Sequence, residues 1–177
     1  MFITPFVSQL LQWLPLFVFM LYPRFREMSA DVWQEAFYAA SVCALLVIAF
    51  LSYKKIILDR LRLGISVFLM IGAAAFLIDA EQVLIFYDTY KGAAFFVAML
   101  LVGIVTTLFS DFGFVGIAGD KDTVRKNSLY LLGTTVCALI WSVVTNSQDM
   151  FVSIAIPFIV LRLYRLSLIK TLTRIQD

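Results

Sequence analysis

The sequence predicts an all-α fold, a polytopic membrane bundle of about six transmembrane helices with both termini in the cytoplasm. Composition, the lengths of the apolar segments and the distribution of charge support it. The 177 residues are 62% hydrophobic and 15% charged, whereas soluble domains average about 45–50% apolar and about 25% charged residues. So short a chain is unable to bury helices that are apolar on all sides, which excludes a soluble fold.

The apolar segments come close to the length that a membrane requires, about 20 residues with a range of about 17–25. They cover residues 2–22, 32–53, 61–78, 92–109, 129–145 and the run from 150 to 161. Pro15 and Pro157 lie inside the first and the last segment, where each removes one helical hydrogen bond. Residues 1–161 are therefore predicted to form a single six-helix transmembrane domain.

Two connections between the segments stand out. Residues 79–91 mix carboxylates with an apolar middle, which predicts an interfacial turn or a short helix. Residues 110–128 form the longest connection, and the glycines Gly113, Gly116 and Gly119 in it indicate an irregular, flexible loop.

Lysine and arginine concentrate on one side of the predicted bundle. With six spans, the second loop, the fourth loop and the C-terminal tail share a side. That side carries Lys54, Lys55, Arg60, Arg62, Lys121, Arg125, Lys126, Arg162, Arg165, Lys170 and Arg174. The opposite side carries only Arg24, Arg26 and Lys91. Because cytoplasmic loops are enriched in Lys and Arg, this bias places both termini in the cytoplasm of a bacterial inner membrane.

The C-terminal segment, residues 162–177, is predicted to be a separate basic, amphipathic cytoplasmic tail. Arg162, Arg165 and Arg174 alternate there with leucines and isoleucines at helical spacing. Such a helix either continues out of the bilayer or lies on its inner surface. Together with Lys170 and the loop cations Lys54, Lys55, Arg60 and Arg62, it forms a predicted basic membrane surface that attracts anionic headgroups.

Small residues in the spans predict where helices pack closely. Ala36, Ala40 and Ala44 recur every fourth residue, and Gly72 opens a run of small residues in the third span. Small side chains let helix backbones approach one another in a membrane. We expect a helix–helix contact at each place.

Chemistry-bearing residues are scarce. The chain has no histidine, which removes the commonest general base and the usual ligand of haem and zinc. No cofactor and no metal site is predicted, and no basic domain suits a nucleic acid. The carboxylates Asp79, Glu81 and Asp88 form a candidate acidic cluster at the outer surface, where they either bind a cation or set the topology.

The opening segment LLQWLPLFVFMLY, centred on Leu14, Pro15 and Leu16, resembles the start of the bacterial intracellular septation protein A family. The order of a basic stretch after the second span, a short acidic loop and a longer fourth loop agrees as well. The chain departs from the family in lacking a basic, proline-containing stretch after the fourth span, and in its longer tail. The resemblance implies an inner-membrane protein that supports envelope maintenance and division through protein contacts, with no catalytic residues.

These observations lead to three hypotheses. The first is a non-enzymatic scaffold or accessory subunit in envelope biogenesis or division, embedded in the lipid bilayer with a membrane-protein partner or a second copy of itself. The second is a small transporter or substrate-binding membrane subunit for a lipid or another apolar molecule. The third is a membrane enzyme, which requires Asp79, Glu81 and Asp88 to converge.

Overall fold

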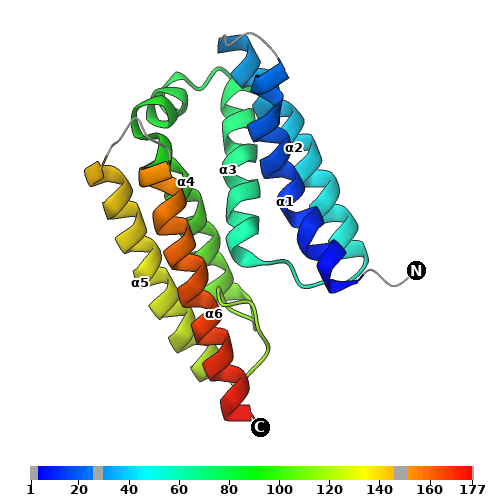
Figure 1. Ribbon diagram of the computed structural model, residues 1–177, viewed down its shortest axis with the longest axis vertical. Helices are drawn as coiled ribbons and strands as arrows, with labels where there is room; N and C mark the ends of the chain where they lie inside the picture. The colour runs from blue at the N-terminus through cyan, green and yellow to red at the C-terminus, as the bar shows by residue number, and fades with distance from the viewer. Residues whose placement is uncertain (1–3, 26–29, 146–150, 177) are drawn as a thin grey trace. The chain divides into compact units, whose positions relative to one another are not determined.

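The computed structural model describes residues 4–25, 30–145 and 151–176, and within these ranges all regular secondary structure is helical. Six of the described helices are long and apolar enough to cross a membrane. The chain is therefore a polytopic membrane protein of the all-α class, as the composition predicted (Figure 1). The helices belong to two compact units, Met1–Ile85 and Phe86–Asp177.

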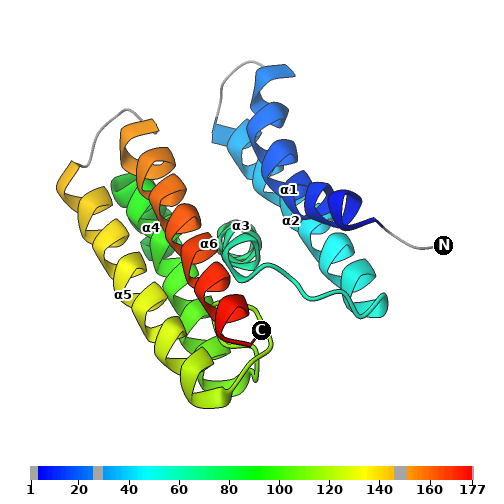
Figure 2. The same cartoon turned by 60° about the horizontal axis from the view of Figure 1, so that its bottom comes forward.

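The first unit is an antiparallel set of three long helices. Helix α1 spans Pro5–Leu21 and leads into a 3-10 turn, η1, at Tyr22–Phe25. Helix α2 spans Ala30–Tyr53, and α3 spans Arg60–Leu77. In both views α1 and α2 lie side by side, and α2 also packs along α3 (Figures 1 and 2).

The second unit contains the remaining long helices. Helix α4 spans Glu81–Phe109, with its first five residues in the first unit, and α5 spans Lys121–Thr145. A π-helical turn, η2, covers Phe151–Ala155 and runs directly into α6 at Ile156–Gln176. Helices α4, α5 and α6 lie side by side in both views (Figures 1 and 2).

Three helices are longer than their apolar segments. Helix α4 begins at Glu81, so the segment expected to form an interfacial turn or a short helix is, from that residue onward, the first part of α4. Helix α5 begins at Lys121 and includes two polar turns before its apolar part. Helix α6 continues to Gln176, so the predicted tail and the last span form one helix. Hydropathy marks where a helix leaves the hydrocarbon, whereas the backbone hydrogen bonds continue into the polar region.

Phe37 organises the core of the first unit. Its ring lies 4.8 Å from the ring of Phe19, 6.0 Å from Phe68 and 5.7 Å from Phe76, measured between centroids. A Cβ atom placed on Gly72 would come within 2.4 Å of the Phe37 ring, so only glycine lets this ring lie against α3. The alanines predicted to pack, Ala36, Ala40 and Ala44, are all fully buried.

The second unit also relies on close helix contacts. A Cβ atom on Gly92 of α4 would lie 2.4 Å from Ser142 Oγ of α5, and one on Gly103 would lie 2.7 Å from Leu132. Phe95 of α4 meets Phe158 of α6 at a centroid distance of 5.9 Å. Small residues thus bring α4 against its neighbours, as expected for membrane helices.

Pro157 explains the start of α6. Proline has no N–H, so the carbonyl five residues earlier, that of Val152, receives no bond from it in the π-helical turn. The indole Nε1 of Trp141 on α5 donates to this carbonyl at 3.1 Å and replaces the missing donor. The same bond ties α5 to the first turn of the last helix.

We predict that Gly72→Ala destabilises the protein by about 1–3 kcal/mol, because the Phe37 ring has to shift in a packed core. The matched control is Gly133→Ala in α5, where a Cβ atom meets nothing within 4 Å. That change should be neutral or should stabilise the helix by about 0.5–1 kcal/mol. Thermal unfolding of both variants in mild detergent is the measurement, and equal midpoints would contradict the assigned packing.

Candidate functional site

Arg62 is a buried charge near the start of α3. Arg62 is 5% exposed, and its Nη1 donates to the carbonyl of Gln9 on α1 at 3.1 Å. Its guanidinium carbon lies 5.0 Å from the centroid of the Trp13 ring, a cation–π distance. Asp59 contributes a carboxylate oxygen 3.8 Å from Nε. The charge predicted to lie on the membrane surface is therefore inside the first unit, where it joins α1 to α3.

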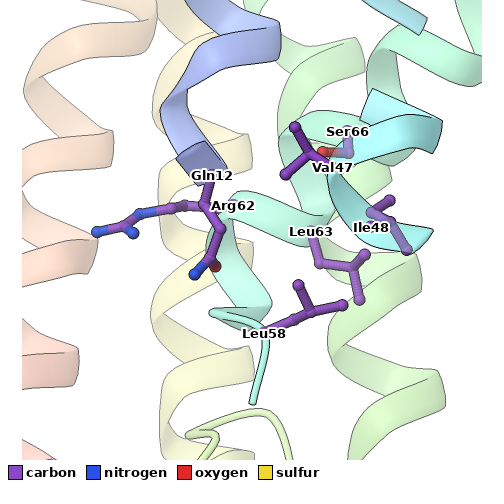
Figure 3. A pocket seen from close by; sticks show the side chains of 7 residues that line it. All are labelled: Gln12, Val47, Ile48, Leu58, Arg62, Leu63 and Ser66. Atoms are coloured by element: carbon purple, nitrogen blue, oxygen red, sulfur yellow. The ribbon is translucent and has the colours of Figure 1, made fainter. Parts of the chain in front are cut away.

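Gln12 extends this polar cluster. Its Oε1 accepts from the backbone N–H of Asp59 at 2.8 Å, and its Nε2 donates to the carbonyl of Ser8 at 3.2 Å. Gln12 and Arg62 also line a hollow of about 10 Å³, about the space that one water molecule needs. Figure 3 shows the guanidinium of Arg62 directed away from Ile48 and Leu63, so the hollow borders its alkyl stem. This site is too small for a substrate.

Arg165 plays the corresponding part in the second unit. It is 9% exposed, and its Nε donates to the carbonyl of Val115 at 2.9 Å. Val115 and Phe114 belong to the connection between α4 and α5, and both are fully buried. The hydroxyl oxygen of Ser128 accepts from their two backbone N–H groups at 3.4 and 3.0 Å. The loop is thus held from α5 by Ser128 and from α6 by Arg165.

The glycines of this loop have a conformational role. Gly113 and Gly116 have φ angles of +56° and +77°, in the left-handed region that favours glycine. A Cβ atom on Gly113 would also lie 2.3 Å from Ser128 Oγ. The sequence suggested flexibility at these positions, but the structure uses both to fold the loop back against Ser128.

Both ends of the loop carry exposed charges. Lys121 Nζ lies 3.0 Å from Asp111 Oδ1, and both side chains are exposed. Asp120 caps α5, because its Oδ2 accepts from the backbone N–H of Thr123 at 3.1 Å and from the Thr123 hydroxyl at 3.0 Å. These bonds lower the pKa of Asp120. The carboxylate form is the one that caps the helix.

The charges of α5 and α6 indicate where the hydrocarbon ends. Hydropathy alone extends the last candidate span to Thr171. Arg162 is exposed, however, and an exposed arginine at the bilayer centre costs about 2.5–3.5 kcal/mol or more. With the boundary that the sequence predicts, after Leu161, the part of α6 from Arg162 to Gln176 rises about 21 Å along its axis. We call this part of α6, the loop 110–120 and the first two turns of α5 the basic extension.

The remaining predicted cations take different positions. Lys54 and Lys55 are exposed after α2, with Lys54 Nζ 5.4 Å from the Tyr53 ring centroid and Lys55 at a φ of +54°. Arg60 is half-buried at the first position of α3, and Lys170 is exposed on α6. Arg174 lies in α6, but its side chain is outside the described part.

The predicted acidic cluster consists of exposed side chains. Asp79, with a φ of +49°, lies in the turn after α3, and Glu81 opens α4. Asp88 follows Glu81 by two helical turns, a rise of about 10 Å. Among the described residues, no group of three or more His, Cys, Asp or Glu side chains is arranged to hold a metal ion.

A larger apolar groove lies between α2 and α3, with a volume of about 330 Å³. This is at the lower end of the range for small-molecule sites, about 300–1,000 Å³. Its lining residues are Tyr38, Ser41, Val42, Leu45, Met70, Ala73, Ala74 and Leu77. Ser41 Oγ donates to the carbonyl of Leu69 at 2.9 Å, so its hydroxyl proton is already used.

Sequence reasoning missed the hydrogen-bond partners of Arg62 and Arg165, and it missed the groove between α2 and α3. Gln12 was the detectable signal, because an amide in an apolar helix usually has an internal partner. Ser128 and the α2–α3 groove had no comparable signal in the sequence. Comparison with known proteins adds no further assignment, since no protein-family model, curated protein or solved structure matches this chain.

We predict that Arg165→Met opens the loop at Val115. The variant keeps the apolar stem but leaves a buried carbonyl without this donor, which costs about 1–3 kcal/mol. The measurement is labelling of Val115→Cys by a membrane-impermeant maleimide, after Cys43 and Cys137 are replaced by alanine. Labelling should rise with Arg165→Met and stay low with the control Arg162→Met, whose side chain is exposed. Equal labelling in both backgrounds would show that Arg165 does not hold the loop.

Proposed function

We propose that this chain is a non-enzymatic scaffold or accessory subunit of the bacterial inner membrane, acting in envelope biogenesis or division. It works by association with a membrane-protein partner or a second copy of itself. The single observation that carries the proposal is the basic extension, which is held together by Arg165 and Ser128 and presents exposed side chains beyond the predicted hydrocarbon boundary.

The composition of the basic extension suits a protein contact. Leu163 is 61% exposed, and Tyr164 and Leu166 are exposed on the same helix. Five exposed cations accompany them: Lys121, Arg125, Lys126, Arg162 and Lys170. Exposed apolar side chains among charges are typical of interaction surfaces. The five exposed cations outnumber the exposed carboxylates of the extension, Asp111, Asp120 and Asp122, and this excess of positive charge favours an acidic partner.

The buried polar groups support a structural use of the remaining charges. Arg62 and Arg165 each donate to a backbone carbonyl within their own unit. Charged groups buried in membrane proteins often mark a transport pathway or a proton relay. Here their hydrogen bonds join helices and a loop, which favours a protein that presents a fixed surface. The resemblance of the opening segment to the septation protein A family supports the assignment to envelope maintenance.

A second function, binding of a lipid or another apolar molecule, has support of its own. The α2–α3 groove has room for a hydrocarbon group, and both helices that form it are candidate membrane spans. A transporter or a substrate-binding subunit would use such a groove. It belongs to the first unit, so it is independent of the basic extension.

The association surface is testable by site-specific photocrosslinking in cells. A photoreactive amino acid at position 163 should give a discrete adduct with a protein, either a partner or a second copy. The control position is 46 on α2, where Leu46 is 67% exposed within a candidate span and should contact lipid. Absence of any protein adduct from position 163, with intact protein in the membrane, would contradict the proposed function.

The proposed orientation is testable separately. Green fluorescent protein should fluoresce when fused to either terminus, because both are placed in the cytoplasm. Alkaline phosphatase should be active when fused after Tyr90, beyond the third span, and inactive when fused after Lys126 in the fourth loop. The reverse activities would invert the orientation and place the basic extension outside.

A further inference from the structure

The α2–α3 groove is apolar along its walls. Ala73 and Ala74 form a small-residue wall on α3, and Val42 and Leu45 face it from α2. Two hydroxyls line the groove: Ser41 Oγ donates to the carbonyl of Leu69, and Tyr38, at one end, accepts from Gln34. Because both helices are candidate membrane spans, the groove lies at the depth of the hydrocarbon. A polar occupant would lose its hydration there and gain no donor in return.

The length of the groove favours a chain over a helix. On α2 it extends from Tyr38 to Leu45, a rise of about 10 Å. A partner helix would pack along most of the bilayer thickness of about 30 Å and would need a continuous stripe of small residues. The bulky Met70 and Leu77 flank the two alanines instead. A flexible acyl chain fits this short, narrow depression.

One end of the groove is polar. Tyr38 accepts a hydrogen bond from Gln34 Nε2 at 3.0 Å, one turn nearer the start of α2. Side chains on a helix tilt toward its N-terminus, so this hydroxyl points to the membrane surface at which α2 begins. Asp31 lies on the same face of α2, three residues before Gln34 and seven residues before Tyr38. An occupant is therefore apolar inside the groove and polar at this rim.

The rim is also acidic. Asp31 is exposed in the first turn of α2, and Asp79 is exposed two residues after Leu77, the last groove residue of α3. The nearby cation Arg24 belongs to η1, on the α1 side of α2, where the Tyr22 hydroxyl donates to Glu35 at 2.7 Å. Carboxylates at the groove rim attract an ammonium group and repel a headgroup with only negative charge.

We propose that the α2–α3 groove holds one acyl chain of a phospholipid whose headgroup carries an amine, with the ammonium at Asp31 and Asp79. The site does not depend on the association proposed for the basic extension. A lipid held there would add its chain to the apolar surface of the first unit and its amine to the acidic end of α2.

The test is lipid retention by the full chain, measured by native mass spectrometry in mild detergent. The protein is offered equal amounts of phosphatidylethanolamine and phosphatidylglycerol with identical acyl chains. One phosphatidylethanolamine per chain should remain bound. Ala74→Trp, or Val42→Trp from the opposite wall, should reduce retention about tenfold or more by filling the groove. Leu46→Trp, on the same helix but outside the groove lining, should retain the lipid.

The headgroup is tested with Asp31→Asn combined with Asp79→Asn, which should remove the preference for phosphatidylethanolamine without abolishing retention. Equal binding of both lipids by the unaltered chain would overturn the assigned headgroup. The hydrocarbon site itself is overturned if the groove-filling variants retain lipid as Leu46→Trp does, or if a protein segment occupies the groove in place of lipid. Circular dichroism and gel filtration establish that each variant is folded before it is scored.

Discussion

Hydrocarbon offers no hydrogen-bond partner, so each backbone group that leaves the helical pattern inside an apolar bundle has to find one within the protein. Side chains supply these partners at the irregular points of this chain. Gln12 accepts from the N–H of Asp59 ahead of α3, and Ser128 accepts from the loop before α5. Trp141 donates to the carbonyl that Pro157 leaves unbonded. These three side chains supply bonds at points where the helices are interrupted.

The two buried arginines follow from the same constraint. A guanidinium has five N–H donors and keeps its charge, so burial is tolerated only when carbonyls, carboxylates or rings surround it. Arg62 has the Gln9 carbonyl, the Asp59 carboxylate and the Trp13 ring within its unit. Arg165 has the carbonyl of Val115. Both belong to the eleven Lys and Arg residues whose distribution predicted the cytoplasmic side. Each of these two arginines therefore contributes both to the charge bias and to packing.

Sequence alone was informative where one physical effect dominates. Long apolar runs predicted the fold class and the bounds of the second, third and fourth spans, because the bilayer thickness sets them. Glu81 and Lys121 show where this failed: charged residues ended the predicted segments, but the helices α4 and α5 begin at these residues. The burial of Arg62 and Arg165 could not be predicted from the sequence, because their acceptors lie 53 and 50 residues away in the chain. Hydropathy carries no information on such pairs.

This distinction separates two kinds of polar residue. Those directed inward, such as Arg62, Arg165 and Ser128, make hydrogen bonds that join helices or a loop within one unit, so their loss acts on folding before any interaction is affected. Those directed outward, such as Asp31, Asp79 and Lys170, are exposed and contribute little to stability. A defect from an outward substitution in a stably folded variant therefore reports an interaction. Ala74 in the groove wall is small and exposed, so enlarging it tests occupancy of the groove without removing a buried polar side chain.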